Sequence, residues 1–304
     1  MSLTKEIRKL LLLIINYLLN HSLVLRLLGK INRKARWIKN IFIAYPATPE
    51  YAKAYAYERL YPKMKWTPWL ASLLTYHRSS GIMMVISGTE EDFQDSRNVS
   101  HLKLMVKRVE TIAHLLSVSQ ITYAGILPGI LYKNHIRKSF LEADITISAI
   151  LLSEKQIQKQ FGYSSDVPLI VIGSRGFLGA RLTDLLGNRP VYPVDSPSEN
   201  IANTQAWPSH LHHMQAVVIN LSRKFVLSRY THLFWPELII INDVYPEPSS
   251  VEIEQISTIG CSFFHITGIK GRAYPEFPGA YQGALPCCST CHESSLPVIV
   301  KQLC

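Results

Sequence analysis

Three glycines that follow a short apolar run are the residues of this chain whose types and spacing point most clearly to chemistry. The run extends from Leu169 to Ile172, and Gly173, Gly176 and Gly179 come directly after it. Gly173 allows a sharp turn, Gly176 allows a pyrophosphate to approach the backbone, and Gly179 allows a following helix to pack close to the strand. We therefore expect a dinucleotide site, for NAD or NADP, at this turn.

A second short strand, expected from Val191 to Val194, ends in Asp195. Asp195 lies about twenty residues beyond the first glycine, where an acid hydrogen-bonds an adenosine ribose. Its charge repels a 2′-phosphate and favours NAD, whereas Arg175 favours NADP, so both cofactors remain open. The expected cofactor contacts are Gly173, Ser174, Arg175, Gly176, Phe177, Leu178, Gly179, Asp195, Ser222 and Asn242.

Polar residues also follow the later apolar runs of the chain. In an open α/β sheet, ligands gather beyond the carboxyl ends of the strands. We place Ser222 and Asn242 at the nicotinamide end, although Asn and Asp at such positions also close turns and cap helices. The strand-end candidates are Asn220, Ser222, Arg223, Asn242, Asp243, His265, Thr267 and Gly268.

All five cysteines lie in the last 44 residues. Cys288-Ser-Thr-Cys291 followed by His292 resembles half of a zinc site, but a second pair at the usual spacing is missing, and no metal is expected. A cysteine beside a histidine can also be a nucleophilic thiol, for which Cys291 is the candidate and Cys288 the reserve. The third alternative is that these cysteines are small buried residues without a chemical role.

The histidines 210, 212 and 213 are interpreted as part of a solvated turn rather than as metal ligands.

The N-terminal region is both apolar and basic. Residues 1–40 carry nine Lys or Arg and one acid, so most of the formal charge of +10 lies here and a nucleic-acid-binding domain is not indicated. Ile7, Leu10, Leu11, Ile14 and Leu18 form one helical stripe. The run is too short to span a bilayer, and no signal-peptidase site follows it. Either residues 1–36 bind an anionic membrane surface, or their apolar face covers the protein's own core or a partner.

The remaining sequence alternates short apolar runs with helical segments, the pattern of an α/β protein. We expect a helical extension at 1–36, a mixed α/β substrate-side domain at 37–152, a doubly wound Rossmann-type parallel sheet at 153–270 and a cysteine-rich segment at 271–304. Residues 61–78 are interpreted as loop and short helix, and 145–151 as a strand. The helix at 101–117 is expected to bury Leu104, Val109, Ile112, Leu115 and Leu116.

Several short motifs between residues 80 and 295 resemble a known family. They are Ile121-Thr-Tyr-Ala-Gly-Ile126, Ile130-Leu-Tyr-Lys-Asn134, the Gly173 turn, Ile239-Ile-Ile-Asn-Asp243 with Pro246, and Gly260 to Gly268. The chain resembles the long-chain acyl-(acyl-carrier-protein) reductases, which form fatty aldehydes. Its domain order is similar to that of shikimate-dehydrogenase-like and glutamyl-tRNA-reductase-like proteins. The family's nucleophilic cysteine precedes a glutamate by three positions, whereas Cys291 precedes Glu293 by two.

The expected function is that of a two-domain NAD(P)-dependent oxidoreductase acting on a carbonyl or acyl thioester. The resemblance implies an acyl-chain substrate carried on a carrier protein, with a small molecule as the alternative. The competing hypothesis is a non-catalytic nucleotide-binding module that controls attachment to a membrane or partner. With no export signal, we expect the chain in the cytoplasm, peripheral to the membrane if residues 1–36 bind lipid.

Overall fold

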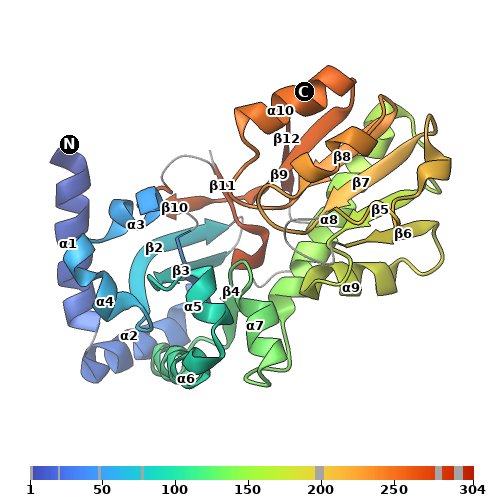
Figure 1. Cartoon of the computed structure of the whole chain (residues 1–304). Coiled ribbons are helices and arrows are strands. Elements are labelled where there is room, and N and C mark those ends of the chain that lie inside the picture. The colour runs from blue at the N-terminus through green and yellow to red at the C-terminus, as the bar shows by residue number, and fades with distance from the viewer. Residues whose placement is uncertain are drawn as a thin grey trace. The chain divides into compact units, whose positions relative to one another are not determined.

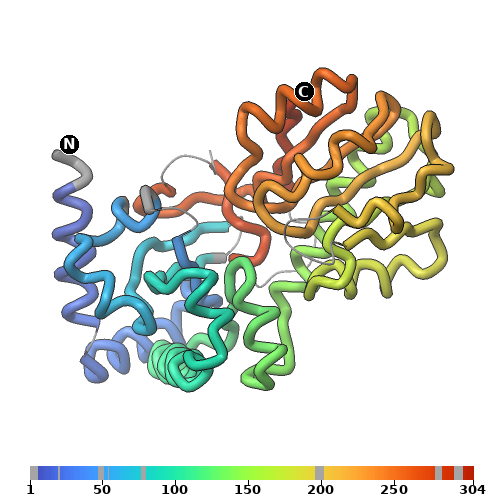
Figure 2. Tube along the Cα trace, viewed as in Figure 1, coloured from blue at the N-terminus to red at the C-terminus, as the bar shows by residue number. Residues whose placement is uncertain are grey.

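The computed structural model describes residues 3–19, 21–46, 49–76, 79–195, 202–277, 283–290 and 297–304. The chain forms two compact units, and it passes between them three times. Unit 1 contains Met1–Ile145 and Ile269–Leu296, and unit 2 contains Thr146–Gly268 and Pro297–Cys304. The path can be followed by colour along the trace in Figure 2. The segment expected at 271–304 is therefore divided between the two units.

Unit 1 is built around a five-stranded mixed sheet with the order β10-β2-β3-β1-β4. Strand β1 is parallel to β3 and β4, whereas β2 is antiparallel to both β3 and β10. The strands are β1 (Ile38–Ala44), β2 (Trp69–Tyr76), β3 (Ser79–Val85), β4 (Gln120–Tyr123) and β10 (Arg272–Tyr274), and β11 (Ala284–Leu285) pairs with the end of β9. The helices are α1 (Leu3–Leu19), α2 (Ser22–Ala35), α3 (Pro49–Tyr55), α4 (Tyr61–Met64), α5 (Glu90–Gln94), α6 (Val99–Leu116) and α7 (Leu127–Lys133), with 3-10 turns η1 (Glu58–Leu60), η2 (Ser96–Asn98) and η6 (Cys287–Ser289).

Helix α8 (Leu141–Phe161) contains the boundary between the units. In unit 2, the strands β5 (Leu169–Ile172), β6 (Val191–Val194), β7 (Ala216–Asn220), β8 (Leu238–Asn242) and β9 (Ser262–Lys270) pair in parallel in the order β9-β8-β7-β5-β6. Strand β12 (Val298–Gln302) pairs with β9. The helices of this unit are α9 (Phe177–Leu185) and α10 (Ser250–Ile259), with 3-10 turns η3 (Ser209–Leu211), η4 (Leu227–Arg229) and η5 (Thr231–Leu233) (Figure 1).

The strand order of unit 2 is that of a doubly wound α/β sheet, in which the order reverses between β5 and β7. The predicted fold class, a mixed α/β domain followed by a Rossmann-type parallel sheet with a helical N-terminus, is confirmed. Strands β5, β7 and β8 are buried along their whole length, which explains why they appear in the sequence as continuous apolar runs rather than as alternating ones.

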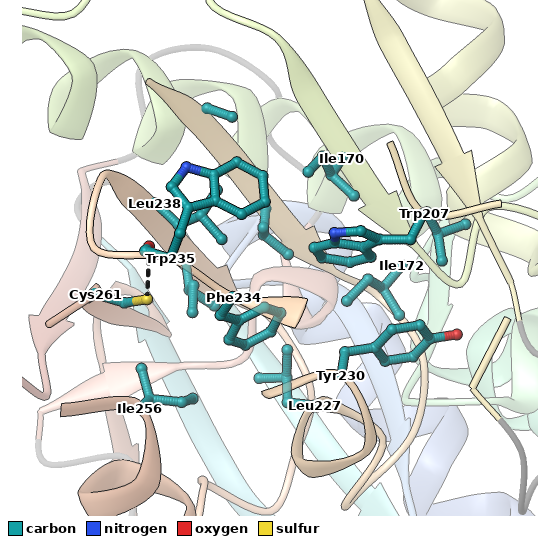
Figure 3. Packing of buried hydrophobic residues seen from close by; sticks show 14 of the residues in the cluster. Ile170, Ile172, Trp207, Leu227, Tyr230, Phe234, Trp235, Leu238, Ile256 and Cys261 are labelled. Atoms are coloured by element: carbon teal, nitrogen blue, oxygen red, sulfur yellow. Dashed lines mark hydrogen bonds between the residues drawn. The ribbon is translucent and has the colours of Figure 1, made fainter. Parts of the chain in front are cut away.

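Aromatic side chains form the core on one side of this sheet. Trp207, Tyr230, Phe234 and Trp235 pack around the strand residues Ile170 and Ile172, as Figure 3 shows. The rings of Trp207 and Tyr230 stack with centroids 5.6 Å apart. The Cys261 thiol donates to the Trp235 carbonyl oxygen at 3.2 Å. The variable region before β7 therefore contributes Trp207 to the core, and this cysteine is structural.

Three sequence predictions are wrong. Residues 69–76, expected in a loop, form β2, whose mixed burial pattern lacks the alternation of a half-buried strand. Residues 145–151, expected as a strand, lie inside α8, because a short apolar run does not distinguish a strand from a buried helix. Leu104, expected in the core, is exposed, because α6 buries the neighbouring stripe that contains Leu102, Met105 and Val109.

Candidate functional site

The glycine turn leads directly from β5 into α9, at the point where the strand order reverses. Gly173 has a φ of +89°, and a Cβ there would lie 2.8 Å from the backbone nitrogen of Ser222. A Cβ on Gly179 would lie 2.1 Å from the carbonyl oxygen of Gly173. These two glycines are therefore required by the fold, as the sequence predicts: one for the turn and one for the close approach of helix and turn.

Gly176 differs from the other two glycines. It is exposed, it is the N-cap of α9 with ordinary extended backbone angles, and a Cβ there would meet only the Gly173 oxygen, at 3.0 Å. The fold therefore requires glycine less strictly here than at positions 173 and 179. The close approach of a ligand is a reason for the absence of a side chain at Gly176. The spacing Gly-x-x-Gly-x-x-Gly is one residue longer than the common Gly-x-Gly-x-x-Gly.

The additional residue is Arg175, and its backbone ties the turn to β6. The Arg175 N–H donates to Asp195 Oδ2 at 2.9 Å, and the Gly173 and Ser174 N–H groups both donate to the Val194 carbonyl oxygen. The Gly176 N–H donates to the Gly173 oxygen at 2.9 Å. Because these four amides are used within the protein, donors to an anion must come from the first turn of α9.

The first turn of α9 supplies such donors. The N–H groups of Leu178 and Gly179 have no intrahelical acceptor, and the part of the chain that the structure describes offers them no other hydrogen-bond partner. The Gly176 N-cap has no side chain to accept from them. The guanidinium of Arg181, which sequence reasoning missed, lies 3.8 Å from the centroid of the Phe177 ring and donates to the Phe177 carbonyl oxygen. The start of α9 is thus positive, and it is exposed at Gly176 and partly exposed at Leu178, whereas Gly179 is buried.

The carboxyl ends of β7 and β8 and the interior of β9, which continues to Lys270, bring together a second group of predicted residues. Asn220, Asn242 and His265 occupy neighbouring register positions on these three strands. Asn220 Nδ2 donates to Asn242 Oδ1 at 2.7 Å, and Asn242 Nδ2 lies 3.0 Å from His265 Nδ1. The Ser222 hydroxyl donates to Asn220 Oδ1. Ser222 and Asn242 are therefore linked through Asn220, in one line of hydrogen bonds along the sheet edge.

His265 ends this line in a buried position. Because Asn242 donates to Nδ1, the proton of the neutral ring is assigned to Nε2, which is buried and has no partner among the described residues. Burial lowers the pKa of His265 to about 4, so the ring is neutral at physiological pH. The Tyr245 ring packs edge-on against it, and the Tyr245 hydroxyl donates to the Thr267 carbonyl oxygen at 2.7 Å.

A shallow surface hollow lies beside the same line. Its walls combine the strand-end amides with basic residues and the start of α10: Asn220, Arg223, Lys224, Phe225, Leu227, Asn242, Val244, Pro246, Pro248 and Glu252. Three of the strand-end candidates, Asn220, Arg223 and Asn242, thus lie on one surface.

Of the two cysteines predicted as nucleophiles, the structure describes Cys288 and not Cys291. Cys291 and the following His292 and Glu293 lie outside the described residues. Cys288 is partly exposed and lies in η6 of unit 1. The carbonyl oxygen of the next residue, Ser289, accepts from Asn40 Nδ2 at 2.7 Å and from the Tyr76 hydroxyl, so this turn is fixed to the sheet of unit 1. No group of three His, Cys, Asp or Glu within the described ranges is arranged to hold a metal ion.

Unit 1 also has a polar group at the carboxyl ends of its parallel strands, which the sequence did not indicate. The Tyr45 hydroxyl, just after β1, donates to Glu90 Oε1 at 2.8 Å and accepts from the Ile126 N–H at 3.1 Å. Gly125 approaches so closely that a Cβ there would lie 2.1 Å from the Tyr45 oxygen. Burial, followed by the Glu90 charge, holds the pKa of Tyr45 well above its usual range, so the phenol stays protonated.

Comparison with known proteins gives similarity of fold alone. No family model and no curated protein matches the chain. L-tryptophan dehydrogenase from Nostoc punctiforme is 14% identical, with a TM-score of 0.34, over 75% of this chain and 69% of that chain. A putative malic enzyme (malate oxidoreductase) is 13% identical, with a TM-score of 0.33, over 76% of this chain and 66% of that chain, just under two thirds of its length.

Proposed function

We propose that the chain is an NAD(P)-dependent oxidoreductase in which the turn between β5 and α9 of unit 2 holds the dinucleotide. The observation that carries the proposal is the start of α9. An exposed glycine N-cap and the free N–H groups of Leu178 and Gly179 lie at the point where the sheet order reverses. A pyrophosphate fits this position because its charge complements the helix N-terminus and its bulk needs the missing side chain at Gly176.

The preferred cofactor in this proposal is NAD. The Asp195 carboxylate is held at the end of β6 by the Arg175 N–H, so its position relative to the turn is fixed. A carboxylate there accepts hydrogen bonds from a ribose diol and repels a 2′-phosphate. The positive charges of Arg175 and Arg181 favour the 2′-phosphate of NADP instead. The Arg181 guanidinium, however, already lies over the Phe177 ring and donates to the Phe177 carbonyl oxygen.

The proposed substrate is a carbonyl compound or an acyl thioester. The bound nicotinamide supplies or accepts a hydride. In this proposal Ser222 and Asn242 orient the amide of the nicotinamide, Asn220 links these two side chains, and the neutral His265 fixes Asn242 from the other side. For a thioester, the thiolate of Cys291 or Cys288 would displace the carrier thiol, and hydride transfer to the acyl-enzyme would release the aldehyde and regenerate the thiolate.

Two substitutions at one residue test the site. Asp and Ser both cap helices well, so Gly176→Asp and Gly176→Ser should each preserve the stability of α9. Only Gly176→Asp places a negative charge against the pyrophosphate, and we expect it to weaken NADH binding by about 100-fold or more, well beyond Gly176→Ser. The measurement is fluorescence titration with NADH and NADPH. Gly187→Ala is the control, because a Cβ there would make only an ordinary contact with the Asp184 carbonyl oxygen, at 3.6 Å. Unchanged binding by Gly176→Asp would exclude the turn as the site.

A second pair of variants tests the chemistry. NADH oxidation with a long-chain acyl thioester and with the corresponding aldehyde separates the two substrate classes. If the covalent step operates, Cys291→Ala or Cys288→Ala abolishes reduction of the thioester but spares that of the aldehyde, and Cys304→Ala, in unit 2, changes neither. Saturable NADH binding with no turnover of either substrate would favour the non-catalytic nucleotide-binding module.

A further inference from the structure

Helix α1 turns its apolar stripe away from unit 1. Ile7, Leu10, Leu11, Ile14 and Leu18 are each between 50% and 53% exposed. The buried positions of the helix are Leu12 and Asn16, on the opposite side. A surface helix of a globular protein normally buries its apolar stripe, so this helix is oriented against that rule.

Polar contacts fix this orientation. Asn16 Oδ1 accepts from the Leu70 N–H at 2.6 Å, and Asn16 Nδ2 donates to the Leu70 carbonyl oxygen at 2.8 Å, so the side chain pairs with β2 as a backbone would. The Lys9 ammonium lies over the Tyr57 ring, 5.4 Å from its centroid, and pairs with Glu6. Turning the leucines inward would break these bonds and leave buried polar groups unpaired.

Helix α2 repeats the arrangement. Its inward positions are Leu25, Gly29 and Asn32. The missing side chain of Gly29 allows contact with α6, and Asn32 Nδ2 donates to the Leu116 carbonyl oxygen at 3.1 Å. Leu23, Leu27 and Ile31, at a spacing of four residues, form an exposed apolar stripe. Trp37 follows the helix and is 70% exposed. Two consecutive helices thus present large apolar side chains that unit 1 does not cover.

The same helices carry a net positive charge, although Glu6 pairs with Lys9. No acidic residue occurs between Glu6 and Glu50. Five basic side chains of α2 and its C-cap are exposed: Arg26, Lys30, Arg33, Lys34 and Arg36. Exposed apolar groups rimmed by Lys and Arg match the headgroup region of an anionic bilayer, where the chains enter the acyl boundary and the cations meet lipid phosphates and carboxylates.

We propose that α1 and α2 dock unit 1 on an anionic lipid surface, with both helices lying in the interface. No single helix in the described ranges is long and apolar enough to cross a bilayer, and Glu6–Leu19 with Ser22–Ala35 pass that test only as a pair bent by 92°. A second copy of the chain fits this face less well, because a twofold contact would bring two basic rims together with no acid between them. This proposal does not depend on the dinucleotide site.

The test is flotation of the full chain with vesicles of phosphatidylcholine, alone or mixed with phosphatidylserine, at low and high salt. We expect binding to the mixed vesicles only, weakened by salt. The double variant Leu10→Glu, Ile14→Glu should reduce the partition coefficient by at least about tenfold, because it replaces two apolar side chains that the bilayer would bury with charged ones. Leu185→Glu, on α9 of unit 2, is the control, because Leu185 is also an exposed leucine.

A charge-reversal pair tests the basic rim. Lys30→Glu with Lys34→Glu should reduce the partition coefficient by about 25-fold or more, since each cation near an anionic surface contributes about a factor of five. Lys155→Glu with Lys159→Glu has the same spacing and net charge on α8 and should have little effect. All these side chains are exposed, and thermal melts will show that the variants are folded.

Several results would overturn the proposal. They are the absence of binding to mixed vesicles, equal binding to neutral vesicles, and unchanged binding by the Leu10→Glu, Ile14→Glu variant. A lipid-free dimer that this variant dissociates, with no vesicle binding by the parent protein, would assign the face to a second copy. Trp37 gives an independent readout: its emission should shift to the blue with mixed vesicles, and Trp37→Phe should abolish the shift.

Discussion

At the scale of single residues, His265 is a titratable group of unit 2 that the fold removes from water. It is fully buried between Asn242 and Tyr245, and its ring is neutral because burial lowers its pKa to about 4. In the unfolded chain a histidine titrates near its ordinary pKa of about 6.5. The folded and unfolded states therefore bind different numbers of protons between these two values.

This difference predicts a pH-dependent stability. As the pH falls from about 6.5 to about 4, the unfolded state takes up a proton that the folded state excludes, and the free energy of unfolding falls by up to about 3 kcal/mol. Urea unfolding of the parent protein and of His265→Gln at several pH values measures this change in the free energy of unfolding. The variant removes this titration and leaves all others, so parallel pH curves for the two proteins would contradict the prediction.

At the scale of elements, the contact between α2 and α6 depends on one glycine. A Cβ on Gly29 would lie 2.0 Å from the carbonyl oxygen of Leu115, a backbone atom that cannot move independently. Replacing a helical glycine with alanine ordinarily stabilises a helix by about 1 kcal/mol. Here we expect the opposite sign: Gly29→Ala should destabilise the protein by about 1–3 kcal/mol through overpacking. Chemical denaturation measures the change, and Lys30→Ala, exposed on the same helix, is the control.

The packing of α9 against its turn gives a second prediction at this scale. Gly179→Ala places a methyl group 2.1 Å from the Gly173 oxygen, so α9 must move away from β5. Both the free energy of unfolding and NADH binding should fall, the first by about 1–3 kcal/mol. Gly176→Asp should lower binding alone. Thermal melts and fluorescence titration of both variants distinguish the two roles, and normal stability of Gly179→Ala would show that the helix tolerates the displacement.

At the scale of the whole molecule, the chain leaves unit 2 and returns to it. Residues 269–296 belong to unit 1, after which β12 pairs with β9 of unit 2. The Leu303 N–H donates to the Phe263 carbonyl oxygen at 2.7 Å, and the Phe263 N–H donates to the Cys304 oxygen at 3.0 Å. The last residues are therefore part of the second sheet.

Leu303→Pro tests the pairing of the last residues with β9, because proline removes the N–H that Leu303 donates to the Phe263 carbonyl oxygen. We expect a lower melting temperature and faster hydrogen exchange at Phe263 in β9. Exchange at Phe42, in β1 of unit 1, should stay as in the parent protein. Gln302→Ala, which changes an exposed side chain and keeps every backbone donor, is the comparison. Unchanged exchange at Phe263 would mean that β9 does not need this segment.

The sequence by itself determined the segment from Leu169 to Asp195. A buried strand, a glycine turn, an amphipathic helix and a second strand are specified by neighbouring residues, so local apolar pattern and glycine conformation suffice. The strand ends that carry Asn220 and Asn242 could be located in the same way, whereas the strand that carries His265 continues to Lys270, beyond the end expected from the sequence. The basic, apolar character of the N-terminus was equally clear from composition.

The tertiary structure alone decided which of these features meet and which face solvent. The line from Ser222 to His265 depends on the register of three strands that are more than twenty residues apart, which no local pattern encodes. The apolar stripe of α1 would suit a core or a membrane equally well, and polar contacts with distant residues, above all the pairing of Asn16 with β2, turn it outward. Burial is a property of the assembled fold, because the partner surfaces come from distant parts of the chain.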